Sequence, residues 1–118
     1  MIQDLVNINR NITNISMTRG DTLAFGFEIE GLDSDQTITN AYFTVKHHKE
    51  DTVNTFQLSF DDQTIMDEGD GLYSVRAIPA LTAGLEPDTY YYDLKIELDN
   101  DTYTIMSGKL IIKKGVKE

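Results

Sequence analysis

The strongest constraint in this sequence is a period-two alternation of apolar and polar residues that recurs along most of the chain. It is clearest in residues 22–30, where small or acidic residues alternate with Leu23, Phe25, Phe27 and Ile29. Alternation of this kind, with aromatic and β-branched side chains on one face, is typical of a half-buried strand. The segment is therefore predicted to be a strand with one buried face.

The same alternation predicts further strands, separated by short clusters of Gly, Asp, Asn and Ser that favour turns. These strands are expected around Ile15 and Met17 and within residues 41–47, 56–60, 73–77, 90–98 and 103–112. Residues 67–71 are expected to be a turn, residues 98–102 a tight hairpin, and Gly108 a bulge where the alternation changes phase. About seven strands predict an all-β fold of two antiparallel sheets packed face to face.

The chain of 118 residues is long enough for one domain. Its predicted parts are an N-terminal arm at residues 1–14, a β-sandwich at 15–113 and a basic tail at 114–118. The arm, with Ile2 and Leu5, packs on the sandwich or on a neighbour, unless it is frayed. One helical turn is predicted near residues 79–84, because Pro stands early in it and Gly at its end.

Composition excludes several classes of partner. The chain holds 20 acidic residues against 10 Lys and Arg, so its net charge of -10 repels nucleic acid. It has no Cys, which excludes disulfides and thiolate zinc sites. No segment approaches the ~18 apolar residues of a membrane span, and no secretory leader is evident, so neither membrane insertion nor export by signal peptide is expected.

The C-terminal end departs from this acidic character, with lysines at positions 109, 113, 114 and 117. A run of like charges is commonly a solvated surface. The alternative is that Lys113 and Lys114 contact an acidic neighbour, which includes another copy of the same chain.

Motifs for catalysis are missing. The sequence contains no Gly-x-Ser-x-Gly elbow and no glycine-rich phosphate loop. His47 and His48 are neighbours on a predicted strand, so they are expected to point to opposite faces and not to share a metal. Acidic turns such as 99–101 offer oxygen ligands suited to calcium, without EF-hand spacing, and leave calcium open. The prediction is a non-enzymatic protein with no cofactor.

Residues 85–92 resemble the tyrosine corner of immunoglobulin-like and fibronectin-type sandwiches, in which a Tyr near the start of a late strand bonds upstream backbone. Spacing from Pro87 favours Tyr91 as the corner, whereas alternation places Tyr90 and Tyr92 inside, and the sequence leaves the choice open. The resemblance implies an immunoglobulin-like sandwich. At least one of the three must face outward, where Tyr is a common interface anchor or a shield for a neighbouring strand.

Five short runs together resemble small β-sandwich proteins of tailed phages and prophages, similar to the N-terminal domain of baseplate upper proteins. They are Ile15–Thr22, Ala41–Lys46, Gly71–Val75, Thr89–Leu94 and Thr104–Leu110. The resemblance implies an immunoglobulin-like fold and a structural role in the virion, or in the host cytoplasm during assembly. Such domains lead into a longer region, whereas this sequence stops at Glu118, which favours an adaptor or accessory role.

The functional expectation is therefore a tail- or baseplate-associated structural protein that acts by protein–protein assembly, with other phage proteins or with itself. Its expected interface residues are Tyr90, Tyr91, Tyr92, Ile2, Leu5, Lys113 and Lys114. The alternative is a carbohydrate-binding module in which Tyr91 and Asp93 hold a sugar, an idea weakened by the absence of Trp.

Overall fold

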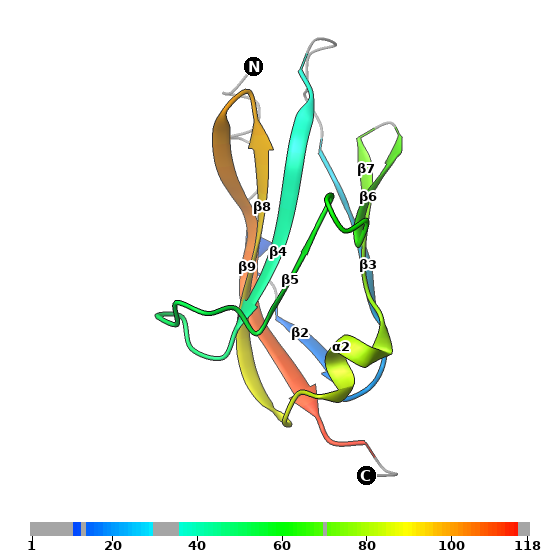
Figure 1. The fold of residues 1–118 in the computed structure, drawn as a ribbon, viewed down its shortest axis with the longest axis vertical. Helices are drawn as coiled ribbons and strands as arrows, with labels where there is room; N and C mark the ends of the chain where they lie inside the picture. Colours follow the sequence, from blue (N-terminus) through cyan, green and yellow to red (C-terminus); the bar gives the residue numbers. More distant parts are fainter. Residues whose placement is uncertain (1–10, 13, 30–35, 70, 116–118) are drawn as a thin grey trace.

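Two β-sheets lie face to face in the computed structural model, which describes residues 11–12, 14–29, 36–69 and 71–115 (Figure 1). Nine strands and one short helix are assigned within these residues. The all-β fold class is confirmed, with more strands than sequence alternation indicated. No helix in the described part of the chain is long and apolar enough to cross a membrane.

The larger sheet has six strands in the order β1-β9-β8-β4-β5, with β2 also paired to β9. They are β1 (Asn11–Ile12), β2 (Ile15–Thr18), β4 (Ile38–Lys46), β5 (Phe56–Ser59), β8 (Asp88–Leu98) and β9 (Asp101–Lys113). The central pairs are antiparallel as predicted, whereas β1 and β2 both run parallel to β9. Two residues of the predicted arm thus take part in the sheet, while Ile2 and Leu5 lie outside the described residues.

The smaller sheet has the order β3-β7-β6, with β3 (Leu23–Glu28), β6 (Ile65–Gly69) and β7 (Leu72–Ala77). The prediction of a turn over residues 67–71 was wrong for its first part, because β6 extends to Gly69. Only Ile65 of β6 is buried, so this strand shows no alternation. The turn follows it, and Gly71 is required there: its φ is +79°, and a Cβ would lie 2.5 Å from the Ile29 carbonyl oxygen.

The strand order is that of an immunoglobulin-like sandwich. In such domains strands B, E and D share one sheet, and C, F and G the other, which variable-type domains extend by C′. Here β3-β7-β6 reproduces B-E-D, and β5-β4-β8-β9 reproduces C′-C-F-G. The predicted fold is confirmed.

An aromatic cluster joins the two sheets at the centre of the core. Phe43 of β4 is fully buried, stacks on Tyr92 of β8 with ring centroids 5.1 Å apart, and meets Phe25 of β3 edge-on at 5.5 Å. Antibody domains place an inter-sheet disulfide and a buried Trp in this region. The chain has no Cys and no Trp, and aromatic contacts hold the sheets together instead.

The β8–β9 hairpin is the longest in the molecule and ends in the predicted tight turn. Asp99 and Asn100 both have positive φ, as a two-residue type I′ turn requires. Further from the turn, Leu94 pairs with Met106, and the next residue, Lys95, pairs with Thr104. Ile105 is therefore the extra residue of a bulge in β9. The bulge predicted at Gly108 was wrong, because Gly108 pairs regularly with Tyr92.

A tyrosine corner fixes the start of β8, and Tyr90 forms it. The Tyr90 hydroxyl donates a hydrogen bond to the Glu86 carbonyl oxygen, 2.8 Å away and four residues upstream. The predicted helical turn, α2 (Pro79–Ala83), precedes this corner. It is held to the turn between β2 and β3 by Thr82, whose buried hydroxyl donates to the Asp21 carbonyl oxygen at 2.7 Å.

Candidate binding groove

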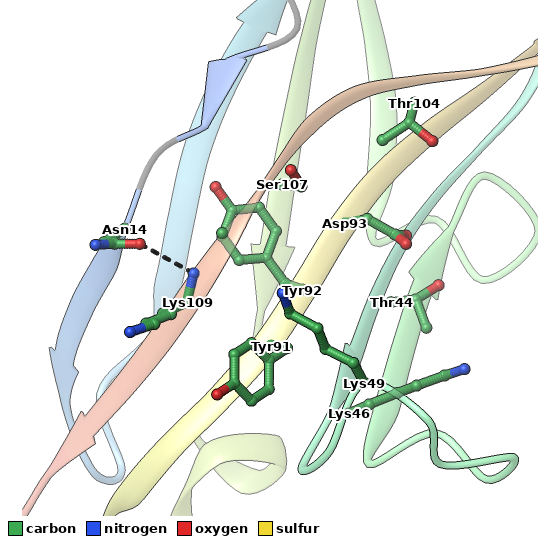
Figure 2. Close-up of a pocket in the computed structure, with 11 residues that line it drawn as sticks. Asn14, Thr44, Lys46, Lys49, Tyr91, Tyr92, Asp93, Thr104, Ser107 and Lys109 are labelled. Carbon is green, nitrogen blue, oxygen red and sulfur yellow. Dashed lines mark hydrogen bonds between the residues drawn. The ribbon is translucent and has the colours of Figure 1, made fainter.

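An open groove of about 470 Å³ lies on the outer face of the six-stranded sheet (Figure 2). Strands β4, β8 and β9 supply most of its lining through side chains that point away from the core. We call it the Tyr91 groove. Its lining residues are Asn14, Thr44, Lys46, Lys49, Tyr91, Tyr92, Asp93, Thr104, Ser107, Gly108 and Lys109.

The register of β8 with its two neighbouring strands explains the row of side chains at the centre of the Tyr91 groove. Tyr91 is paired with Lys109 on one neighbouring strand and with Lys46 on the other. Directly paired residues of antiparallel strands share one face, with Cβ atoms about 5 Å apart. Figure 2 accordingly shows Lys109 and Lys46 on opposite sides of Tyr91. Lys49, from the loop after β4, places its ammonium nitrogen 5.2 Å from the centroid of the Tyr91 ring.

The three groove lysines lack an acidic partner within the described part of the chain. None of Lys46, Lys49 and Lys109 forms an ion pair there, although acidic residues outnumber basic ones two to one over the whole sequence, 20 to 10. Clustered like charges repel one another and favour binding of a group of opposite charge. The groove is thus a local positive site on an acidic protein.

One carboxylate faces the same groove. Asp93 is half-buried, and its Oδ1 atom is shielded from solvent without a hydrogen-bond partner among the described residues. Its strand neighbours in register are Thr44 and Ser107, both lining the groove. A buried polar atom without a partner is uncommon in native structures and is satisfied when a ligand supplies a donor. Asp93 therefore offers an acceptor beside the lysines.

Hydrogen bonds hold the groove rim in place. The Asn14 side-chain oxygen accepts a hydrogen bond from the Lys109 backbone N–H at 3.1 Å, which fixes the segment between β1 and β2 against β9. On the other side, the Gln57 amide donates to the Thr44 hydroxyl oxygen at 2.9 Å. The rim is formed by paired strands on both sides, so the groove is largely preformed.

Of the three consecutive tyrosines, the structure places only Tyr91 on the outer face. Tyr90 and Tyr92 are each 4% exposed and belong to the core. Burial raises the pKa of both hydroxyls above the ordinary value for tyrosine, so both stay protonated donors at neutral pH. The two inner tyrosines are therefore in place to hold the fold, and Tyr91 is the one accessible to a partner.

The predicted basic tail begins at the end of β9. Lys113 and Lys114 are both exposed, and the Lys113 carbonyl oxygen accepts a hydrogen bond from the Arg19 backbone N–H at 2.8 Å. Neither lysine lines the groove. Alternation and charge runs did not single out Lys46 and Lys49, and they assigned Lys109 to the basic C-terminal run without placing it beside Tyr91. The proximity of these lysines depends on the pairing of β4, β8 and β9.

The histidine pair differs from its prediction. Both residues follow the end of β4, so they do not alternate, and their rings stack at 4.6 Å. The Nε2 atom of His47 lies 2.8 Å from an Asp88 carboxylate oxygen. This hydrogen bond, together with one from the Thr89 backbone N–H, lowers the pKa of Asp88 below its ordinary value. Among the described residues no three His, Asp or Glu side chains gather as metal ligands.

Comparison with known proteins adds little beyond the fold. Neither a family model nor a curated protein sequence matches the chain. Among solved structures, the extracellular domains of the voltage-gated sodium channel beta4 subunit, described as parallel homodimers with a role in cell-cell adhesion, align with a TM-score of 0.48 and 14% identity over 90% of this chain and 94% of theirs. Extracellular domains 3–5 of Drosophila OTK align with a TM-score of 0.46 and 14% identity over 92% of this chain, which spans 34% of theirs. Likeness at this level carries no argument about function.

Proposed function

We propose that this chain is a non-enzymatic structural module of a phage or prophage virion, associated with the tail or baseplate, which binds an acidic protein partner through the Tyr91 groove. The observation that carries the proposal is the gathering of three lysines, without an ion pair among the described residues, around an accessible tyrosine in a chain of net charge -10. Tyr is enriched at protein interfaces, and a cluster of like charges attracts a partner of opposite charge.

The lining of the groove supports binding over catalysis. It contains one carboxylate, Asp93, and no imidazole. Acid–base hydrolysis needs a pair of positioned proton-transfer groups, and nucleophilic catalysis needs a base beside the nucleophile. The hydroxyl groups of Thr44, Thr104 and Ser107 line the groove without an imidazole among its lining residues, and none of these hydroxyls forms a hydrogen bond with Asp93 or a groove lysine within the described part of the chain.

The phage assignment rests on the sequence resemblance of the five short runs. They lie on or next to β2, β3, β4, β7, β8 and β9, so they build the sandwich core and the face that carries the groove. We place the protein in the virion, or in the host cytoplasm during assembly. Other structural proteins of the particle are the proposed partners.

The test is incorporation into particles. Particles purified from the host strain should contain the wild-type chain, and Lys46→Glu should lower its content about tenfold or more by reversing a charge at the interface. Lys95→Glu is the matched control, because Lys95 also points outward from the same sheet but does not line the groove. Particles without the wild-type chain, or equal losses for both variants, would refute the proposal.

Carbohydrate binding is a second candidate, and one observation favours it. Tyr91 and Asp93, the residues expected to hold a sugar, do line the same groove, together with several hydroxyl groups. The Lys49 ammonium over the Tyr91 ring must move aside before a sugar can stack there. A glycan array would show binding that Tyr91→Ala abolishes, and an array without hits would remove this candidate.

A further inference from the structure

The Tyr91 groove presents a definite order of charges. Two ammonium groups, of Lys46 and Lys109, flank Tyr91, and the acceptor oxygen of Asp93 lies one pleat further along β8. A complementary occupant carries two negative groups with a hydrogen-bond donor between them. An occupant with negative charge alone would leave the Asp93 oxygen unsatisfied.

The tip of the β8–β9 hairpin carries that complementary order. Its residues are Asp99, Asn100 and Asp101, which are all exposed, so an amide donor stands between two carboxylates. The type I′ turn fixes the backbone of Asp99 and Asn100. The hairpin tip lies at the end of the sandwich away from α2 (Figure 1).

Several other described acidic turns have carboxylates that already accept hydrogen bonds. Asp51, Asp62 and Asp67 each accept from a nearby backbone N–H, and Asp88 contacts His47. At the hairpin tip, Asp101 is hydrogen-bonded to the Tyr103 side chain, whereas Asp99 and Asn100 have no side-chain partner among the described residues. The tip therefore offers the Asp99 carboxylate and the Asn100 amide to a second surface.

The tip cannot reach the groove of its own chain. Asp99 follows Tyr91 along the same extended strand, so the two are separated by about 26 Å at the rise of a β-strand. Only a second molecule can bring its tip to this groove.

We propose that the partner in the Tyr91 groove is a second copy of this chain, whose Asp99-Asn100-Asp101 tip enters the groove with its carboxylates toward Lys46 and Lys109 and its amide toward Asp93. This inference rests on the proposed function, whose partner surface it specifies. The contact is head-to-tail, since groove and tip are different surfaces. Each added copy therefore presents a free groove and a free tip, and the copies form a ring or a linear stack.

The experiment uses two variants of the full chain, each defective on one side of the contact. Lys46→Glu with Lys109→Glu disables the groove, and Asp99→Asn with Asp101→Asn removes the charge of the tip. Asn tolerates the positive φ at position 99, so the turn is preserved. Unchanged thermal midpoints show that both variants fold. Lys95→Glu is the control for a general change of surface charge.

Size-exclusion with light scattering at about 1 mM protein and low salt should show wild-type oligomers, which dissociate near 1 M salt. Each variant alone should be monomeric. An equimolar mixture should double in mass and grow no further, because the intact tip of one variant meets the intact groove of the other. Monomeric wild type, or a mixture that stays monomeric, overturns the inference.

Particle incorporation separates this inference from the function on which it rests. If the groove variant is lost from particles while the tip variant is retained, the groove binds a different acidic protein. The proposed function then stands, and self-association through the tip is refuted. If both are lost together, the head-to-tail contact is supported.

Discussion

The two faces of strand β8 show how differently one residue type acts at consecutive positions. Tyr90 and Tyr92 point inward, where one forms the corner with Glu86 and the other stacks on Phe43. Tyr91 points outward between two lysines. Alternation along a strand separates side chains that hold the fold from side chains that are accessible to a partner. Residues on the outer face can therefore be replaced with little effect on the packing of the inner face.

Removal of the central ring should have the largest effect. Phe43→Ala empties the contact between both sheets, so we expect a loss of about 3–5 kcal/mol in the free energy of unfolding, measured by urea denaturation. That is a large part of the stability of a domain of this size. A loss below about 1 kcal/mol would show that the aromatic cluster does not join the sheets, and the contrast between the faces would fail.

Loss of the tyrosine corner should lower the free energy of unfolding by a smaller amount, and the neighbouring tyrosine provides a matched control. Tyr90→Phe removes the hydroxyl that donates to the Glu86 carbonyl, and we expect it to cost about 1–2 kcal/mol. Tyr91→Phe makes the same chemical change one residue further along and should stay within about 0.5 kcal/mol of wild type. Equal costs in thermal or urea unfolding would show that the two faces are not distinct.

A turn carboxylate and the groove carboxylate also differ in their hydrogen-bond partners. Asp62, in the turn between β5 and β6, accepts bonds from the Thr64 side chain and from the backbone N–H groups of Thr64 and Ser59. Burial by itself raises the pKa of Asp62, but these bonds together outweigh it and lower the pKa below the ordinary value. Asp93 on the groove face has an oxygen without such a partner among the described residues.

We therefore expect Asp62→Asn to cost about 0.5–1 kcal/mol at neutral pH, reduced by the exposure of the site, and Asp93→Asn to cost less. Because the folded pKa of Asp62 is lowered, its contribution is present above the unfolded pKa of about 4 and is lost as the pH falls through the folded value. Urea unfolding of wild type and Asp62→Asn should thus converge in acid. A gap that persists at the lowest accessible pH would contradict this assignment.

The outer face should give the smallest effect on stability. Tyr91→Ala leaves the core untouched and should change the free energy of unfolding by about 0.5 kcal/mol or less. It should nevertheless weaken partner binding by about tenfold or more, as truncation of an interface tyrosine does. A variant that unfolds easily but still binds would reverse the roles assigned to the two faces.

Much of the fold followed from local pattern. The alternation of Leu23 to Ile29 and of residues 90–98 placed the strands correctly, because one face of each is buried. Strand β6 was missed since its exposed residues carry turn-forming types and only Ile65 contributes to the core. The bulge was predicted too far along the sequence because its extra residue, Ile105, is itself buried. The alternation of apolar and polar residues therefore shows its change of phase only after Ile105.

The groove was only partly accessible to sequence reasoning. Tyr91 and Asp93 were identified because they share one face of a single strand. Lys46 and Lys109 lie far from them in sequence, and their proximity is set by the register of β8 with both neighbours. Which tyrosine formed the corner was likewise open, since spacing and alternation gave different answers, and alternation proved correct.

The aromatic cluster at the centre of the sandwich has a consequence for where the protein can work. Where a disulfide joins the sheets, a domain needs an oxidising environment to mature and is weakened by reductants. In this chain Phe25, Phe43 and Tyr92 meet without a covalent bond. The thiol–disulfide poise of the surroundings therefore has no influence on this junction.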